Sequence, residues 1–564
     1  MNIIYIHFFQ IKILKMESLE NFMFKSISYN VLLQLSFRLF SFVLNAILFR
    51  YVSIDLIGVC NFRLALLYST IIFLSREPFR RALPTFEHVK SKMNQFVNSL
   101  WLVVLNGILV SIFFGYLWSN VFENPNEQSV PYYKYAVFLC CLSCVIELCG
   151  ETSNCLTQML LLAKLKVLIE ASSLLIFNII FVILAIYVPG LGALSYSIAR
   201  LVNSILYVLS NNYFLLENLN KNDKKCDEKN KKKLGLIDLL PQIKQYKLDL
   251  DYLTLVKAYY TQSILKQILT EGEKYLITAF SLLSFSESGI YDLVNNLGSL
   301  IARFIFLPIE DASYIYFTNT FKRGAKYKEQ INDFNKLKLN SVKNYFELFL
   351  KILSLIGVVV LVFGQSYSKL LLHFYGGEKL SSNSISVNML RFHCVYIYFL
   401  AVNGLTESFY NATMSESQLK KHNYRLVLFS AVFLILAFIF AKLFHIYGFL
   451  LANCLNMGIR IFYSSVYIRS FFTDYKYQQD EPQQQSIGYN IQQGLIPNFS
   501  LGLVLSISIV ITKLSESFFS NTFLQLAFHL LIGIVFFFIT LFTIFKYEKQ
   551  LVSYLMSFLK SKLK

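Results

Sequence analysis

The chain has 564 residues, of which 55% are hydrophobic and only 15% are charged, and its mean hydropathy is positive. That balance leaves too little polar surface for a soluble globule, and it argues against a soluble enzyme or a nucleic-acid binder. The net charge of +18 fits this reading, because Lys and Arg gather in loops between apolar segments, where they orient a membrane protein. We therefore expect a lipid bilayer to be the solvent of this chain.

A helix needs about 20 apolar residues to cross a bilayer core of about 30 Å. About fourteen segments of the chain meet this requirement, so the sequence predicts an all-α, polytopic membrane protein. In chain order they are 28–50, 56–75, 96–119, 133–160, 165–188, 191–215, 258–283, 288–309, 343–364, 388–412, 425–443, 447–469, 497–514 and 524–545.

A long basic loop after the sixth segment separates the first six predicted helices from the rest. This spacing predicts two six-helix lobes and an added C-terminal pair, and repeated halves are typical of transporters. The predicted parts are an N-terminal cytosolic extension at 1–27, an N-lobe at 28–215, a basic cytosolic linker at 216–257, a C-lobe at 258–470, a cytosolic linker at 471–496, and a helix pair with a basic tail at 497–564.

Loop charge predicts the orientation, because Lys and Arg accumulate on the cytoplasmic side of short loops. The loops after the second, sixth, eighth and tenth segments are rich in cations, whereas those after the first, third, fifth and seventh are nearly free of them. The longest run of cations is Lys221, Lys224, Lys225, Lys229, Lys231, Lys232 and Lys233. We therefore expect both termini and this linker to face the cytosol.

Polar residues recur at helical spacing inside five of the apolar segments, which places them on one face of each helix. The stripes are Gln34/Arg38/Asn45, Glu147/Glu151/Asn154/Gln158, Gln267/Glu271/Lys274/Thr278, Asp292/Asn296/Ser299/Arg303 and Asn453/Asn456/Arg460. Charges at mid-bilayer are unfavourable unless they pair or contact water, so the stripes predict a hydrated central cavity. The alternative for any single residue is an interhelical hydrogen bond or a side chain that reaches the interface; we expect Arg50, Arg76 and Arg80 to be interfacial.

Motifs for chemistry are weak in this sequence. Six of the seven histidines, His88, His373, His393, His422, His445 and His529, are scattered with no pair at metal spacing, and we expect no metal site, no cofactor and no catalytic residue. A phosphate-binding Gly-rich loop with Lys is absent from the sequence, which argues against direct use of ATP. Asp249-Leu250-Asp251 is similar to a metal-binding sugar-nucleotide motif, but we interpret it as part of a solvated linker.

Several longer stretches carry a family resemblance. They are Ser75–Ala82, Leu265–Tyr275, Asn295–Arg303, Tyr375–Gly377, Asn403–Glu407 and Ala452–Arg460. On these stretches the chain resembles the Rft family of oligosaccharide-translocation proteins, within the superfamily of multidrug, oligosaccharidyl-lipid and polysaccharide exporters. The resemblance covers about residues 17–470, and residues 471–564 match in hydropathy alone.

The resemblance implies a multi-pass protein of the endoplasmic-reticulum membrane that acts in N-glycosylation. Its expected partners are membrane lipids and a dolichol-diphosphate-linked, mannose-rich heptasaccharide, which would move from the cytosolic to the lumenal leaflet by alternating access of the two lobes. The residues that we expect to hold this substrate are Arg38, Arg63, Arg303, Lys274, Arg460, Glu271, Asn296, Asn403 and Glu407. Arginine suits a diphosphate because its planar fork binds phosphate oxygens in pairs.

Three other functions stay open at this stage. The chain could be an accessory or scaffold protein of the same pathway that does not move the lipid itself, because family membership indicates a pathway better than an elementary step. It could be a cation-coupled exporter of small amphiphiles, which would share the fold but not the stretches above. A membrane enzyme is the fourth reading, and it lacks a convincing acid, base or metal constellation.

Overall fold

The computed structural model describes residues 40–83, 93–159, 162–223, 239–241, 248–324, 336–473, 498–518 and 522–548. Within these ranges the chain is helical and contains no strand, which confirms the predicted all-α class. Eleven helices there are long and apolar enough to cross a membrane, so the chain is a multi-pass membrane protein. The other three predicted segments correspond to shorter or more polar helices, namely Phe40–Tyr51, α10 (Leu194–Asp223) and α11 (Leu250–Ala279).

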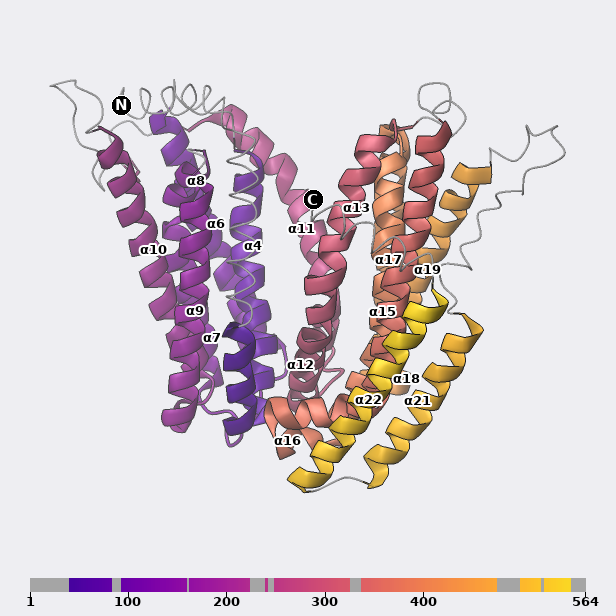
Figure 1. Ribbon diagram of the computed structural model, residues 1–564. Helices are drawn as coiled ribbons and strands as arrows, with labels where there is room; N and C mark the ends of the chain where they lie inside the picture. Colours follow the sequence, from indigo (N-terminus) through magenta and orange to yellow (C-terminus); the bar gives the residue numbers. More distant parts are fainter. Residues whose placement is uncertain are drawn as a thin grey trace. The chain divides into compact units, whose positions relative to one another are not determined.

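The chain forms two compact units, Met1–Gly289 and Ile290–Lys564. In the first unit α4 (Ala65–Arg81) is the central helix and packs against α6, α7 and α11, while α10 packs against α7 and α9 (Figure 1). Leu67 and Ile71 of α4 are completely buried. The other elements of this unit are α3 (Ile54–Ile57), η1 (Gly58–Leu64), α6 (Met93–Tyr116), η2 (Leu117–Val121), α7 (Tyr133–Cys149), α8 (Glu151–Met159), α9 (Ala163–Tyr187) and η3 (Pro189–Leu191).

The second unit is organised around α17 (Ser384–Thr413), which packs against α13, α15 and α19 (Figure 1). Phe409 of α17 is fully buried, and its ring centroid lies 5.1 Å from those of Phe317 and Phe346 and 5.5 Å from that of Phe471. The boundary between the units falls within α12 (Phe285–Ile301). The remaining elements are η6 (Ala302–Phe306), α13 (Leu307–Thr320), α15 (Lys336–Gly376), α16 (Glu378–Ser381), α18 (Glu416–Phe444), α19 (Ile446–Thr473), α21 (Phe499–Phe518) and α22 (Phe523–Tyr547).

The C-terminal pair α21–α22 is attached to α15 through polar side chains. The hydroxyls of Ser366 and Thr512 lie 2.9 Å apart, and Tyr367 donates a hydrogen bond of 2.7 Å to the carbonyl oxygen of His529. The Tyr367 and His529 rings are also stacked, with centroids 4.3 Å apart. In lipid, where apolar faces do not discriminate between partners, such hydrogen bonds help to fix the position of a helix pair.

The start of α11 corrects one interpretation of the sequence. Asp249 is 2% exposed and caps α11, because its carboxylate accepts a hydrogen bond of 3.1 Å from the backbone N–H of Tyr252. The Asp249–Asp251 stretch is therefore a helix start and not a solvated linker. The helices α10 and α11 also extend to Asp223 and back to Leu250, so they include both ends of the predicted linker 216–257.

Three of the described spans contain a π-helical turn, in which one extra residue widens the helix. This turn is η1 in the span Ile54–Arg81, η2 in the span Asn94–Val121 and η6 in the span Phe285–Thr320. A further irregularity is the break between α7 and α8 at Gly150, within the predicted segment 133–160. The turns η1 and η6 each contain an arginine predicted to bind substrate, Arg63 and Arg303.

The two compact units divide the chain later than the predicted linker does. Helix α11, which the sequence analysis assigns to the second lobe, packs against α4 in the first unit. The grouping into two six-helix lobes stays a prediction. The extension 1–27, the residue Arg38, the lysine run 224–233 and the tail after residue 548 lie outside the described residues, as does nearly all of 471–496.

Candidate functional site

The first unit contains a row of ion pairs between α4 and the α7–α8 segment. Arg76 lies 3.4 Å from Glu147, and Arg80 binds Glu151 through two nitrogens, with 3.0 Å between its Nη2 and the Oε2 of Glu151. The two carboxylates are almost completely buried. The break at Gly150 lies between them and starts α8 at Glu151. This arrangement favours interhelical pairing for the polar stripe that contains Glu147 and Glu151, because both acids are neutralised inside the unit.

The same row continues through aromatic residues that the sequence analysis missed. Tyr68 donates a hydrogen bond of 2.5 Å to Glu147, and the Arg200 guanidinium lies 4.1 Å from the centroid of the Tyr68 ring. Arg200 also lies 3.7 Å from the Phe177 ring centroid and donates to the Tyr196 hydroxyl at 3.2 Å. Such cation–π contacts are stronger when water is excluded. The sequence did contain a signal for this group, because Arg200 is an isolated arginine inside the predicted apolar segment 191–215.

Arg63 lies in η1 and is 4% exposed. It donates one hydrogen bond to the backbone carbonyl of Thr278 at 3.2 Å and another to the carbonyl of Glu123, and its guanidinium lies 4.9 Å from the Phe285 ring centroid. The indole nitrogen of Trp118 in turn donates to the Arg63 carbonyl at 3.1 Å. These contacts tie η1 to the end of α11 and to the segment after η2, so Arg63 has a clear structural role.

The predicted residues of α11 form a local pair. Lys274 lies 2.9 Å from Glu271, three residues earlier on the helix, and both side chains are partly exposed. An ion pair of this kind usually contributes less than about 1 kcal/mol to stability. Gln267 on the same face is instead buried and donates to the Tyr275 hydroxyl at 3.0 Å.

The second unit brings three predicted residues together between α17 and α19. Arg460 Nη2 donates to both oxygens of Glu407, at 2.8 and 2.7 Å, and Asn403 donates to Glu407 at 3.1 Å. Two polar atoms of this group, Arg460 Nε and Asn403 Oδ1, are buried without a hydrogen-bond partner among the described residues. Buried polar groups are usually paired, so atoms left over in this way are candidates for contact with a ligand.

Glu310 of α13 lies beside the group of Asn403, Glu407 and Arg460, and it was not predicted from the sequence. Its carboxylate lies directly over Gly404, where a Cβ atom would overlap the Glu310 oxygens. The lack of a side chain at Gly404 therefore leaves room for the Glu310 carboxylate beside the turn of α17 that carries Asn403 and Glu407. The signal in the sequence was the acid pair Glu310–Asp311, which follows the predicted segment 288–309 directly.

Arg303 and Asn296 belong to the continuous helix formed by α12 and η6. Both side chains are exposed, and Asn296 donates a hydrogen bond of 2.9 Å to Asp292, four residues earlier. Arg303 lies in the π-helical turn η6, just as Arg63 lies in the π-helical turn η1. The remaining predicted residue, Arg38, is outside the described ranges.

The described residues contain no group of three or more His, Cys, Asp or Glu side chains that could hold a metal ion. Several charged residues of these ranges, such as Arg76, Arg80 and Arg460, instead pair with acids on neighbouring helices. This chemistry suits the binding of polar or anionic groups, because arginine and asparagine offer several donors and the acids hold them in place.

Comparison with known proteins identifies relatives over most of the chain. The sequence profile of the Rft protein family matches residues 22–558, so the last two helices are included and the expected limit near residue 470 is wrong. Relatives with the name Man(5)GlcNAc(2)-PP-dolichol translocation protein RFT1 include one from a frog and one from a mouse. The one from Xenopus tropicalis is 38% identical over 87% of this chain and 88% of its own length, and the one from Mus musculus is 36% identical over 94% and 95%.

Solved structures show a similar fold. The structure titled "Lipid II flippase MurJ, inward closed conformation" aligns with a TM-score of 0.59 at 15% identity, and it covers 93% of this chain and 99% of that one. An inward-facing multidrug transporter of the MATE family aligns with a TM-score of 0.51 at 12% identity, covering 78% of this chain and 99% of that one. At these identities the likeness concerns the fold.

Proposed function

Because the chain belongs to the Rft protein family, we propose that it translocates the dolichol-diphosphate-linked, mannose-rich heptasaccharide across the endoplasmic-reticulum membrane, from the cytosolic to the lumenal leaflet. The observation that supports this most directly is the 38% identity, over 87% of the chain, to a relative named for translocation of that lipid. Translocation breaks no covalent bond, so the proposed role is transport and not catalysis. The product would supply protein N-glycosylation in the lumen.

The physical need for a protein is large. A diphosphate and many sugar hydroxyls cannot enter hydrocarbon without partners, because each unsatisfied polar group costs several kcal/mol there. Charged and amide side chains on membrane helices can replace the lost water, while the polyprenyl chain stays in the lipid. Alternating access of two lobes about such residues would then expose the head group to each side in turn.

Within this proposal the cluster of Asn403, Glu407 and Arg460 is the strongest candidate for contact with the head group. It alone among the predicted residues combines an arginine with buried polar atoms left without a partner in the described ranges. Arg303 and Asn296 are exposed and are further candidates in the same proposal, together with Lys274 and Glu271. Arg63 is the weaker candidate, because its guanidinium already donates to two backbone carbonyls.

The deciding experiment uses the purified full-length chain in sealed vesicles that contain the lipid-linked heptasaccharide. Appearance of the sugar on the opposite face is followed with a lectin or a glycosidase that cannot cross the membrane. We expect vesicles with the protein to translocate faster than protein-free vesicles. Equal rates, together with restored glycosylation when the same chain is supplied to depleted cells, would overturn translocation and support the accessory role.

Arg460→Ala tests the candidate site in the same assay. The substitution removes the guanidinium that holds Glu407, so we expect the translocation rate to fall at least about tenfold, with partial recovery in Arg460→Lys because lysine keeps the charge but not the fork. Arg469→Ala is the matched control, since Arg469 is an exposed arginine of the same helix. Equal rates for Arg460→Ala and Arg469→Ala at matched protein amounts would remove Arg460 from the site.

A further inference from the structure

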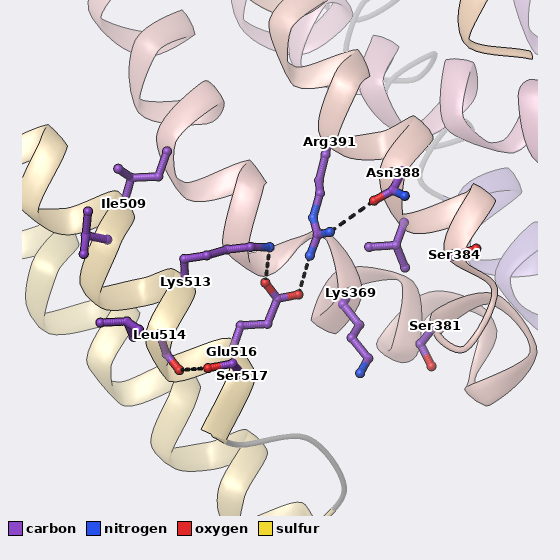
Figure 2. A pocket seen from close by; sticks show the side chains of 12 residues that line it. Lys369, Ser381, Ser384, Asn388, Arg391, Ile509, Lys513, Leu514, Glu516 and Ser517 are labelled. Carbon is purple, nitrogen blue, oxygen red and sulfur yellow. Dashed lines mark hydrogen bonds and ion pairs between the residues drawn. The ribbon is translucent and has the colours of Figure 1, made fainter. Parts of the chain in front are cut away.

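A second polar site lies in the unit Ile290–Lys564, away from the residues discussed above. It is a cavity of about 790 Å³ between the end of α15, α16, the first turns of α17 and the second half of α21. Figure 2 shows that Arg391, Lys513 and Glu516 meet on one side of it and that Lys369 and Ser381 lie on another. None of these five residues is among those that the sequence analysis assigns to a substrate.

The cationic side of this cavity is held rigidly. Arg391 donates from Nη2 to Glu516 at 2.6 Å and from Nε to the backbone carbonyl of Gln365 at 2.8 Å, and its Nη1 bonds Asn388 at 3.2 Å. Lys513 bonds the second oxygen of Glu516 at 2.6 Å (Figure 2). One carboxylate therefore lies between two cations and orients both of them.

Lys369 is the third cation of the lining. It makes no hydrogen bond or ion pair with any of the described residues, although its side chain is only partly exposed. Three cations against a single carboxylate leave the cavity with an excess of positive charge. An excess of this kind next to low-dielectric walls attracts an anion.

Beside these charged groups the lining contains apolar side chains, among them Ile509, Val510 and Leu514 of α21, and the polar residues Ser384, Asn388 and Ser517. The residue Lys369 lies seven positions before the end of α15, and the cavity residues of α17 belong to its first turns. Both helices are long and apolar enough to cross a membrane, so the cavity lies toward the end of the spans, where lipid head groups are found. Cationic and apolar side chains that line one cavity at that depth match an amphiphile with a phosphate group.

We propose that this cavity binds the phosphate head group of an anionic membrane lipid, with Arg391, Lys369 and Lys513 around the phosphate and the lipid chain against α21. The lipid is a resident of the site and separate from any translocated substrate, so the inference does not depend on the proposed function. Bound lipid would link α21 to α15 and α17 beyond the contacts that these helices already make.

The test uses the full-length protein in detergent, titrated with short-chain phosphatidic acid and followed by native mass spectrometry. We expect phosphatidic acid to bind in preference to diacylglycerol, which lacks the phosphate, and to phosphatidylcholine, which lacks the net charge. Lys369→Gln and Lys513→Gln should each weaken binding about fivefold at low salt, since each removes one cation near the phosphate. Lys369→Arg should bind nearly as well as the unchanged protein.

Lys442→Gln provides the matched control, because Lys442 is an exposed lysine near the end of another long apolar helix and does not line the cavity. Thermal unfolding of all variants without added lipid verifies that they fold alike. Equal loss of binding in Lys442→Gln, or no loss in the cavity variants, would overturn the assignment. Inorganic phosphate that binds as tightly and displaces the lipid would show a site for soluble anions and would likewise refute a lipid site.

Discussion

Among the described helices, two chemical settings of arginine contrast with each other. Arg80 and Arg63 have bonded guanidinium groups, one to the carboxylate of Glu151 and the other to backbone carbonyls. Arg460 differs, because it holds Glu407 through Nη2 and keeps a buried Nε without a partner among the described residues. The first setting stabilises a helix interface, and the second leaves binding capacity for another molecule.

Arg80→Ala should therefore act on stability. The substitution leaves the carboxylate of Glu151 buried without its partner, and we expect the free energy of unfolding to fall by about 3–5 kcal/mol. Thermal unfolding of the purified variant in detergent measures this loss. Arg81→Ala is the control, because Arg81 bonds Glu77 on the exposed face of the same helix and should change stability by less than about 1 kcal/mol. Similar losses in both variants would contradict the role of the buried pair.

At this scale the sequence predicts polar stripes well and their partners less well. Helical spacing placed Glu147 and Glu151 on one face, and the structure has both on the face that meets α4. From the sequence we expected their partners Arg76 and Arg80 at the membrane–water interface. Spacing within one helix does not indicate which residues of another helix lie opposite. Glu310 and Arg200 were missed for a related reason, since a single charge has no periodicity.

Helices of this chain are predictable in type and less so in their ends. Apolar length alone gave eleven of the predicted spans, because the bilayer fixes how long such a run must be. The ends depend instead on caps and breaks. The capping box of Ser415 and Gln418 starts α18 at Glu416, well before the predicted segment 425–443 begins. Gly150 divides a run that hydropathy treats as one.

Close approach of two helices is a further feature that hydropathy cannot reveal. Gly58, at the start of η1, lies against the backbone of Phe285 at the start of α12, and a Cβ atom there would overlap the Phe285 carbonyl oxygen. A backbone atom cannot move aside as a flexible side chain can. Glycine at this position is therefore a requirement of packing.

Gly58→Ala should destabilise the fold by about 1–3 kcal/mol, the usual cost of adding an atom to a filled contact. The midpoint of thermal unfolding in detergent reports this change. Gly502→Ala in α21 is the matched control, because beyond the adjacent backbone of α21 no heavy atom of the described residues lies within 4 Å of the added Cβ, and alanine favours a helix. Unfolding of both variants at the temperature of the unchanged protein would contradict the close contact between Gly58 and Phe285.

At the scale of the whole molecule the main expectation is orientation. The lysine run at 224–233 should face the cytosol, because so many cations resist transfer across a membrane. Trypsin added to sealed microsomes should then cut the chain within this run while a lumenal marker protein stays intact. Cleavage that appears only after detergent is added would reverse the orientation.

The attachment of α21 and α22 has a consequence for how the molecule can be built. The pair is joined to α15 by hydrogen bonds of Ser366 with Thr512 and of Tyr367 with His529. An ion pair between Lys351 of α15 and Glu548, directly after α22, adds a third contact. Those contacts need no particular covalent connection between α19 and α21. A chain cut between residues 474 and 497 and synthesised as two polypeptides should therefore reassemble in the bilayer, so that the C-terminal pair behaves as a subunit that happens to be fused.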